Sequence, residues 1–522
     1  MIKILDCTLR DGGYVNDFQF GKNAIKKIIC QLTEANIDII ECGFLEDCQY
    51  DENKSIFNSV EEIKSFIPQN RKNSMYVAMA CYGEYDLNKL SNYDGTSIDG
   101  IRVTFHYNEI DEALNYCRKI QEKGYKIFVQ PVGTTSYTDE QLISLIKNVN
   151  KLQPYSFYLV DTLGLMNQED IMRMFYLINH NLDKSINMGF HSHNNLQLSF
   201  SNCQIFVRLK TDRTISLDSS VYGMGRGAGN LNTELIANFI NDNLSRKYVI
   251  EPILEIVDEF IVHIKEKYEW GYSVPYYLAA INGCHPNYAS YLNDKQTLPV
   301  KSISTILRMI ETENRALFKK EIIEQKYKDF QEREIDDLLT IDKLKQIISA
   351  RNILLIAPGH SLIENQKKIE EYIAKENCLV ISVSFVPDFI KTDYVFLSNS
   401  KRFNTTFNLL EKNINLIHTS NIKNENTNAF VINYSSLLNE EDIIMDNSAL
   451  LALNLLLLLN PQKIYLAGLD GYQTDKENYY AERLNLIQKR ENIIVQNKAM
   501  KNKITELCKK MNINFITSSL YE

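Results

Sequence analysis

The chain lacks the features that mark nucleic-acid-binding and disulfide-rich proteins. Its 522 residues carry 57 Lys and Arg against 66 Asp and Glu, a formal net charge of -9, so no broad basic surface is expected. Its 10 cysteines include no Cys-x-x-Cys pair, which argues against a zinc finger or a disulfide framework and favours reduced thiols. We expect no nucleic-acid partner.

Long apolar segments are also missing. The stretch "MIKILDCTLRDGG" has no apolar core of the kind that a signal peptide needs. The most apolar run, "ALLALNLLLLLNP" at 449–461, is too short to span a bilayer and predicts a buried helix. We therefore expect a cytoplasmic protein without a membrane span, and we expect it to form a homo-oligomer.

A chain of this length needs more than one hydrophobic core. Over residues 1–245, eight short β-rich runs alternate with amphipathic helical stretches, which predicts a (β/α)8 TIM barrel, with an open doubly wound sheet as the alternative. The expected strands are "IKILDCT", "IDIIECG", "SMYVAMA", "GIRVTF", "YKIFVQP", "SFYLVDT", "NMGFHSH" and "TISLDSS".

The remaining chain predicts a helical extension at 246–335, a charged linker at 336–350 and a Rossmann-like α/β domain at 351–522. The last domain opens with "NILLIAPGHSL", a strand, turn and helix that could present backbone N–H groups to a phosphate. It has no G-x-G-x-x-G motif, which argues against a nicotinamide site.

Reactive side chains follow nearly every strand of the predicted barrel. In a TIM barrel the carboxyl ends of the strands form the active-site face, so these groups would converge at one mouth. They are Arg10, Asp11, Glu41, His106, Gln130, Asp161, His191 and His193, followed by the segment "GMGRGAGN".

The segment "FHSHNN" places His191 and His193 two residues apart, so both side chains point to the same face of a strand and could bind one ion. A polar strand end is the plain alternative. Asp11 adds a carboxylate from another strand, which completes a set of two histidines and one carboxylate. This set favours a divalent metal: Mn²⁺ is the expected ion, with Mg²⁺, Co²⁺, Zn²⁺ or Fe²⁺ as alternatives.

Four segments, "DCTLRDGG", "IIECGF", "FHSHNN" and "GMGRGAGNLNTE", resemble in sequence and order the metal-dependent aldolase and acyl-transferase barrels. That family includes hydroxymethylglutaryl-CoA lyase, isopropylmalate and homocitrate synthases and 4-hydroxy-2-oxovalerate aldolase, the last being most similar. The resemblance covers residues 1 to about 300. It implies a carbon–carbon lyase or condensing enzyme that acts through the enolate of a 2-oxo acid such as pyruvate, with an aldehyde or acyl partner.

The resemblance also implies roles for individual residues. Asp11, His191 and His193 match the metal ligands, and Asn230 matches an asparagine that binds or supports the metal. Arg10 matches the arginine that stabilises the enolate, and Glu41 matches a glutamate that orients this arginine. For Tyr276, which matches a tyrosine of the barrel mouth, catalysis and core packing stay open.

One position departs from the family pattern. Where the hydroxy-oxovalerate aldolases have a general-base histidine, this chain has Tyr14. A phenol with an ordinary pKa of about 10 is a poor base at neutral pH. Either His106 or His285 takes the proton, or the substrate differs and Tyr14 shapes the acceptor pocket.

The segments "DNSALLALNLLLLLNPQ" and "IYLAGLDGYQTD" weakly resemble bacterial sialyltransferases and related surface-glycan domains. This implies a nucleotide or nucleotide-sugar pocket near Gly359, Ser361 and Asp470. A scaffold domain without activity is the alternative. For the whole chain, a glycosyltransferase-like enzyme supported by an inactive barrel and a non-catalytic assembly protein also stay open.

Overall fold

The computed structural model describes residues 1–522 except 246, 411–413, 425–427, 474–477 and 485–489. Its contacts divide the chain into two compact units. Unit 1 comprises Met1–Asn287 with Thr312–Phe318, and unit 2 comprises Tyr288–Glu311 with Lys319–Glu522. None of the helices in the described part of the chain is both long and apolar enough to cross a membrane.

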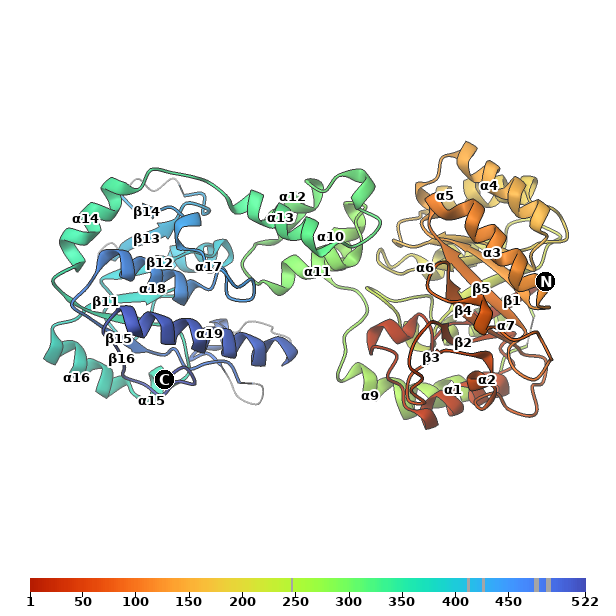
Figure 1. Cartoon of the computed structure of the whole chain (residues 1–522), viewed down its shortest axis with the longest axis horizontal. Coiled ribbons are helices and arrows are strands. Elements are labelled where there is room, and N and C mark those ends of the chain that lie inside the picture. The colour runs from red at the N-terminus through yellow and green to blue at the C-terminus, as the bar shows by residue number, and fades with distance from the viewer. Residues whose placement is uncertain (246, 411–413, 425–427, 474–477, 485–489) are drawn as a thin grey trace. The chain divides into compact units, whose positions relative to one another are not determined.

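Unit 1 contains a closed barrel of eight parallel strands (Figure 1). The barrel closes because β1 pairs with β2 on one side and with β9 on the other. This confirms the predicted TIM barrel and excludes the open sheet. The barrel strands are β1 (Ile2–Asp6), β2 (Ile39–Leu45), β4 (Met75–Cys81), β5 (Gly100–Phe105), β6 (Lys126–Pro131), β7 (Ser156–Asp161), β8 (Asn187–Ser192) and β9 (Ile215–Ser219). The two-residue strand β3 (Ile56–Phe57) pairs in parallel with the last residues of β2.

Helices surround the barrel and bury one apolar face each against the strands. In α1 (Lys22–Glu34), for example, Ile25, Ile28, Ile29 and Leu32 are buried at helical spacing. The others are α2 (Val60–Lys64), α3 (Ile110–Glu122), α4 (Asp139–Leu152), α5 (Gln168–Asn181), α6 (Ser199–Phe206), α7 (Thr233–Asn243) and α8 (Glu251–Ile256), the last of which packs on α1. Unit 1 then continues with α9 (Val262–Lys265), which has no buried residue, and α10 (Val274–Ile281).

The interior of the barrel holds a separate apolar cluster that includes Leu5, Ile39, Val77, Phe128 and Tyr158. Side chains alternate along a strand, so the residues that face this interior are distinct from those that pack on the helices. The interior is therefore a packed core, and polar groups converge where the strands end.

Unit 2 contains a parallel seven-stranded sheet, which confirms the predicted second α/β fold. Its order is β14-β13-β12-β11-β10-β15-β16. The strands are β10 (Asn352–Ile356), β11 (Leu379–Val383), β12 (Tyr394–Leu397), β13 (Asn415–Thr419), β14 (Phe430–Ile432), β15 (Lys463–Ala467) and β16 (Ile513–Phe515). The chain leaves β10 towards β11 and later returns to its other side as β15, so the order reverses between β10 and β15.

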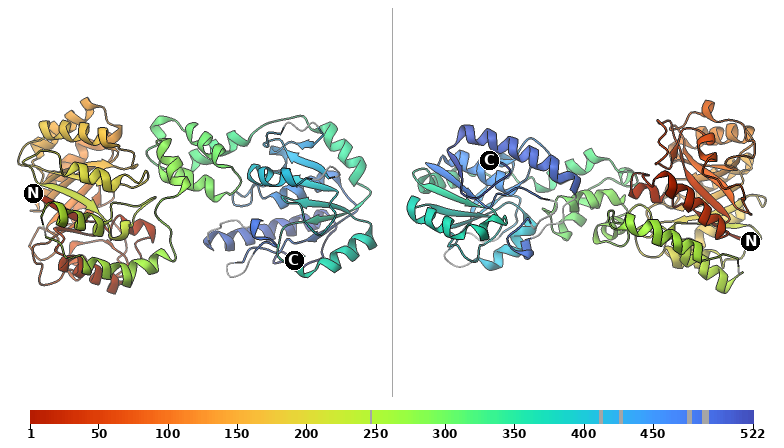
Figure 2. Two further views of the ribbon diagram at one scale, coloured as in Figure 1. Left: turned by 180° about the vertical axis from the view of Figure 1, so that it is seen from behind. Right: turned by 90° about the horizontal axis from the view of Figure 1, so that it is seen from below.

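Helices cover both faces of this sheet (Figure 2). One face packs on α14 (Leu338–Ile348), α18 (Ser448–Leu459) and α19 (Arg490–Lys510), and the other on α15 (Ser361–Glu364) and α16 (Gln366–Glu376). The run at 449–461 is the buried helix α18, as predicted. Unit 2 also includes most of α11 (Pro286–Asp294), together with α12 (Val300–Arg308), α13 (Lys320–Gln331) and α17 (Ser400–Thr406).

The segment predicted as a linker at 336–350 contains α14, whose Leu344 and Ile348 are fully buried in unit 2. The domain boundaries at 245, 335 and 350 stay predictions.

Candidate metal centre and active site

A tight turn directly after β1 fixes the positions of Arg10 and Asp11. The backbone N–H groups of both residues donate to the carbonyl of Cys7, at 3.1 and 2.8 Å. Gly13 follows where any Cβ would come within 2.2 Å of the Phe18 ring, so the turn requires glycine there. The turn holds two oppositely charged side chains at the end of the strand.

Arg10 is held by two carboxylates. Its Nε donates to Glu41 Oε2 at 2.9 Å, and its Nη1 donates to Asp11 Oδ2 at 2.7 Å. All three side chains are buried. Neither contact uses Nη2, so part of the guanidinium fork is available to a substrate.

The contacts continue across the interior and return to Asp11. From β5, Arg102 Nη1 donates to Glu41 Oε2 at 2.8 Å, and its Nη2 pairs with Asp218 of β9. Asp218 Oδ2 lies 2.9 Å from His191 Nδ1, and His191 Nε2 lies 3.2 Å from Asp11 Oδ2. A closed ring of six side chains results: Asp11, Arg10, Glu41, Arg102, Asp218 and His191.

The two histidines of "FHSHNN" point their Nε2 atoms at each other, 3.3 Å apart. Because His191 Nδ1 contacts Asp218, its Nε2 faces Asp11 and His193. A carboxylate behind a histidine is the arrangement that commonly orients a metal-binding imidazole. The three expected metal ligands therefore lie together.

Asn230 reaches the same place from the loop after β9. Its Nδ2 donates to the carbonyl of Met224 at 3.1 Å. The backbones of Asn230 and His193 pair as a single antiparallel β-bridge. A Cβ on Gly225 would lie 2.3 Å from Asn230 Nδ2, so only glycine leaves room for this side chain.

Several buried oxygens of this cluster have no hydrogen-bond partner among the described residues: Asp11 Oδ1, Asn230 Oδ1, Glu41 Oε1 and Asp218 Oδ1. Buried polar atoms are normally paired, so each of these needs an explanation. A divalent cation held by Asp11, His191 and His193, with Asn230 beside it, would satisfy two of them. The residues present therefore fit such an ion.

The charges of the ring also favour a cation. Three carboxylates face two guanidinium groups, which leaves one negative charge without a permanent partner. Burial opposes the charged imidazolium, yet the hydrogen bonds to Asp11 and Asp218 raise the pKa of His191 above its ordinary value. Either a proton on His191 or a metal ion balances this charge.

The pKa of His193 shifts in the opposite direction to that of His191. Burial lowers the pKa of its imidazole to about 3, and the charges of His191, Arg226 and Arg10 act in the same direction, whereas Asp11 opposes them. His193 is therefore neutral at pH 7, which is the form that binds metals.

Cys7 is a neighbour that the sequence reasoning missed. Its Sγ, an Asp11 oxygen and a His191 nitrogen all lie within 4.8 Å of one another. However, this thiol donates to the carbonyl of Ser219 at 3.2 Å, and burial raises its pKa well above the ordinary value. We therefore interpret Cys7 as a protonated side chain that borders the site without binding the metal. Its position in the segment "DCTLRD", close to Arg10 and Asp11, was the sequence signal that could have identified it as a neighbour of the site.

Tyr14 lies at the rim of the barrel. Its ring makes edge contacts with Phe18 and Phe44, with centroids 5.2 and 5.9 Å apart, and remains partly exposed. Loss of water around the hydroxyl raises its pKa to about 12. At neutral pH the deprotonated form that could accept a proton is therefore even scarcer than for an ordinary tyrosine.

The other expected catalytic residues lie outside the cluster. The His106 side chain is exposed after β5, and its backbone N–H donates to Glu109. Tyr276 is half-buried in the first turn of α10, and the described part of the chain shows no side-chain contact between it and the ring. His285 is buried, with Nε2 3.2 Å from Arg226 Nη1.

Unit 2 contains a cavity of about 470 Å³ at the carboxyl ends of β10, β11, β12 and β15. Gly359 and Asp470, two of the residues expected at a nucleotide pocket, line it. Ser361 is not among the lining residues and instead donates its backbone N–H to Asp470 Oδ2 at 2.7 Å.

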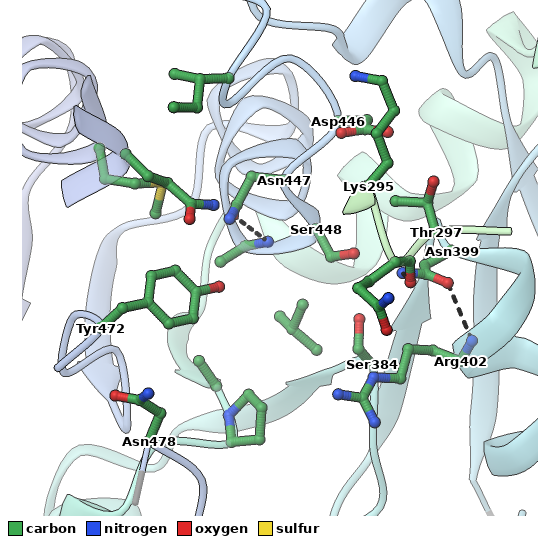
Figure 3. Close-up of a pocket in the computed structure, with 18 of the residues that line it drawn as sticks. Lys295, Thr297, Ser384, Asn399, Arg402, Asp446, Asn447, Ser448, Tyr472 and Asn478 are labelled. Atoms are coloured by element: carbon green, nitrogen blue, oxygen red, sulfur yellow. Dashed lines mark hydrogen bonds between the residues drawn. The ribbon is translucent and has the colours of Figure 1, made fainter. Parts of the chain in front are cut away.

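Figure 3 shows Tyr472 and Asn478 across the cavity from Arg402, with Ser448 at the start of α18. Ser384, directly after β11, has a φ of 69°, and its buried hydroxyl has no hydrogen-bond partner among the described residues. A strained backbone with an unpaired buried hydroxyl is typical of a functional site.

We expect Cys7→Ser to keep the metal. The serine hydroxyl can make the same hydrogen bond to the carbonyl of Ser219 that the Cys7 thiol makes, so the change should leave the surroundings of Asp11 and His191 intact. Metal content measured by mass spectrometry after dialysis should equal that of the wild type. Loss of most of the metal from Cys7→Ser, with unchanged circular dichroism, would show that Cys7 is a ligand.

Three comparisons place these residues among known proteins. A sequence model described as HMGL-like matches residues 1–257. An oxaloacetate decarboxylase of Mycobacterium tuberculosis is 26% identical over 242 residues, 45% of this chain and 68% of that protein. A 4-hydroxy-2-oxovalerate aldolase of Thermomicrobium roseum is 25% identical over 266 residues, 48% of this chain and 73% of that protein.

Among solved structures, an HMG-CoA lyase from Brucella melitensis matches with a TM-score of 0.39 and 15% identity, over 49% of this chain and 95% of that chain. The identification depends on the sequence match, which contains the turn after β1, His191 and His193 at the end of β8 and the loop that carries Asn230. Residues 1–257 therefore form a domain of the HMGL-like family.

Proposed function

We propose that the barrel is a divalent-metal-dependent aldolase that makes or breaks a carbon–carbon bond through the enolate of a 2-oxo acid such as pyruvate. The HMGL-like family consists of metal-dependent aldolases and lyases that act on 2-oxo acids. The observation that carries the proposal is the convergence of Asp11, His191 and His193 beside the guanidinium of Arg10.

Each group has a chemical task at this site. A bound divalent cation, with Mn²⁺ expected, supplies a Lewis acid for the carboxylate and keto oxygens of the 2-oxo acid. Arg10 donates to the ligand Asp11 through Nη1, which leaves Nη2 able to donate to the enolate oxygen. Glu41 holds Arg10 through Nε and is a positioning residue. Asp218 fixes the orientation of His191.

We expect Asp11→Asn and His191→Ala to lose most of the bound divalent metal. Changes outside the ligand set already weaken metal binding about 10–100-fold, so removal of a ligand should cost at least as much. The metal content of purified protein checks this, with His180→Ala on the outer helix α5 as the matched control. Full metal occupancy in both variants, with an unchanged melting temperature, would contradict the ligand assignment.

We expect Arg10→Lys to keep the metal but to lose turnover by ~10²–10³-fold, as when one oxyanion donor is removed. An ammonium cannot contact Asp11, Glu41 and an enolate oxygen at once as the planar guanidinium can. The assay is metal-dependent pyruvate release or consumption. Near-normal turnover would mean that Arg10 only holds the barrel together.

A second candidate function belongs to unit 2. The cavity lies where the strand order reverses between β10 and β15, the place at which open α/β sheets bind ligands. We propose that it takes a nucleotide or nucleotide sugar, with Arg402 and the N-terminal end of α18 near its phosphates. The weak resemblance of "IYLAGLDGYQTD" to surface-glycan domains supports this, and a role in glycan-related metabolism would follow.

We expect a nucleotide that fills this cavity to raise the melting temperature of the full chain by several degrees at saturating concentration. A panel of nucleoside phosphates and nucleotide sugars tests this by thermal shift. Arg402→Gln and Ser384→Ala should reduce the rise, whereas Arg351→Gln, an exposed change before β10, should not. A rise that both cavity variants retain would exclude this cavity as the binding site.

A further inference from the structure

Arg226 is an arginine at the barrel mouth that pairs with no carboxylate among the residues that the structure describes. It follows Gly225 in the loop after β9 and is half-buried. Its guanidinium carbon lies 3.9 Å from the centre of the Tyr14 ring, and its Nη1 lies 3.2 Å from His285 Nε2. In the described part of unit 1, no Asp or Glu forms an ion pair with it.

The two arginines inside the barrel differ from Arg226 in this respect. Arg10 contacts Asp11 and Glu41, and Arg102 contacts Glu41 and Asp218. The neighbours of Arg226 are an aromatic ring and a histidine. Burial and the nearby guanidinium lower the pKa of His285 to about 4, so it is uncharged at neutral pH. Among the described residues of unit 1, the positive charge of Arg226 thus has no anionic partner.

The position of Arg226 relative to the metal ligands is fixed by its loop. Gly225 packs against the Asn230 amide, and residue 230 is bridged to His193. Ala228 N donates to Asn195 Oδ1 at 3.0 Å, which ties the loop to the segment after β8. An anion held by Arg226 would therefore keep a set distance from the metal ligands.

The contacts from the catalytic arginine to Arg226 form one continuous row. Arg10 lies over the Phe44 ring at 5.9 Å, the Phe44 and Tyr14 rings are 5.9 Å apart, and Arg226 lies over Tyr14. One end of the row faces the proposed enolate, and the other end presents a free positive charge at the rim. A molecule that reaches from the enolate carbon to the rim meets this charge.

We propose that Arg226, supported by the face of Tyr14, binds the carboxylate or phosphate group at the far end of the aldehyde partner. This inference rests on the proposed aldolase function and adds the charge class of the second substrate. A guanidinium fork suits both anions, because each offers two oxygens in one plane.

Arg226 takes no part in the bond changes. In the condensing direction, C3 of the 2-oxo acid loses a proton and bonds to the aldehyde carbon, and the aldehyde oxygen gains a proton to become a hydroxyl. Cleavage is the reverse. Arg226 sets only which aldehyde is held in place, so it is a specificity residue, and Tyr14 is its positioning residue.

The test uses two pairs of aldehydes that differ in charge, with pyruvate and Mn²⁺ present. Succinic semialdehyde is compared with butanal, and glyceraldehyde 3-phosphate with glyceraldehyde. For the wild type we expect a higher kcat/KM with the anionic member of at least one pair, and the preferred pair identifies carboxylate or phosphate. Arg226→Met should lower that kcat/KM about 10–100-fold and change the neutral partner by less than about threefold.

Matched variants separate this role from a structural one. Tyr14→Phe keeps the ring beneath Arg226 and should retain the anionic preference, whereas Tyr14→Leu should reduce it. Arg173→Met, on the outer surface of α5, should change neither substrate class. All variants should retain wild-type metal content.

A separate measurement tests the proposed function itself. Exchange of the pyruvate C3 hydrogens in D₂O, followed by mass spectrometry, needs the metal and Arg10 but no aldehyde. If the wild type shows no exchange, the aldolase proposal fails. If exchange occurs, the inference about Arg226 is overturned by absence of turnover with both anionic aldehydes, or by equal losses for charged and neutral aldehydes in Arg226→Met.

Discussion

The closed ring of six buried side chains is the constraint on which the rest of unit 1 depends. Its members come from five strands or strand ends, so the ring forms only when the barrel is closed and each strand is in register. Removing one partner from a buried charge pair typically costs ~3–5 kcal/mol, because the other charge stays buried. The same contacts that close the barrel therefore orient the guanidinium of Arg10 and turn Nε2 of His191 towards Asp11.

Much of this fold could be predicted from residue order alone. Short β-rich runs that alternate with amphipathic helices require a parallel sheet, and eight of them suffice for a barrel. The ends of parallel strands share one edge, which is why Asp11 and His191 could be expected together although 180 residues separate them. In the second domain, the same reasoning placed a strand at the start of "NILLIAPGHSL", where the structure has β10.

The rest of the site could not be predicted, because it depends on pairing across the barrel. Arg102 and Asp218 stand inside apolar strands, "GIRVTF" and "ISLDS", where a buried charge indicates a partner without saying which one. Only the closed barrel brings them together. In unit 2, the "APGHSL" segment pointed to Ser361, but Asp470 already accepts its N–H, and the unpaired hydroxyl of the cavity belongs to Ser384.

The rim explains why a tyrosine suits position 14 in this chain. A histidine there would lie under the guanidinium of Arg226, whose positive charge would disfavour an imidazolium and weaken the imidazole as a proton acceptor. The π-face of a neutral phenol, by contrast, attracts the guanidinium. Tyr14 and Arg226 are therefore physically coupled: with the arginine in place, the ring at position 14 is better suited to holding a charge for substrate recognition than to moving a proton. In the proposed aldolase reaction, another residue at the mouth would then accept the proton of the substrate hydroxyl, and the choice of aldehyde would be separate from the chemistry at the metal.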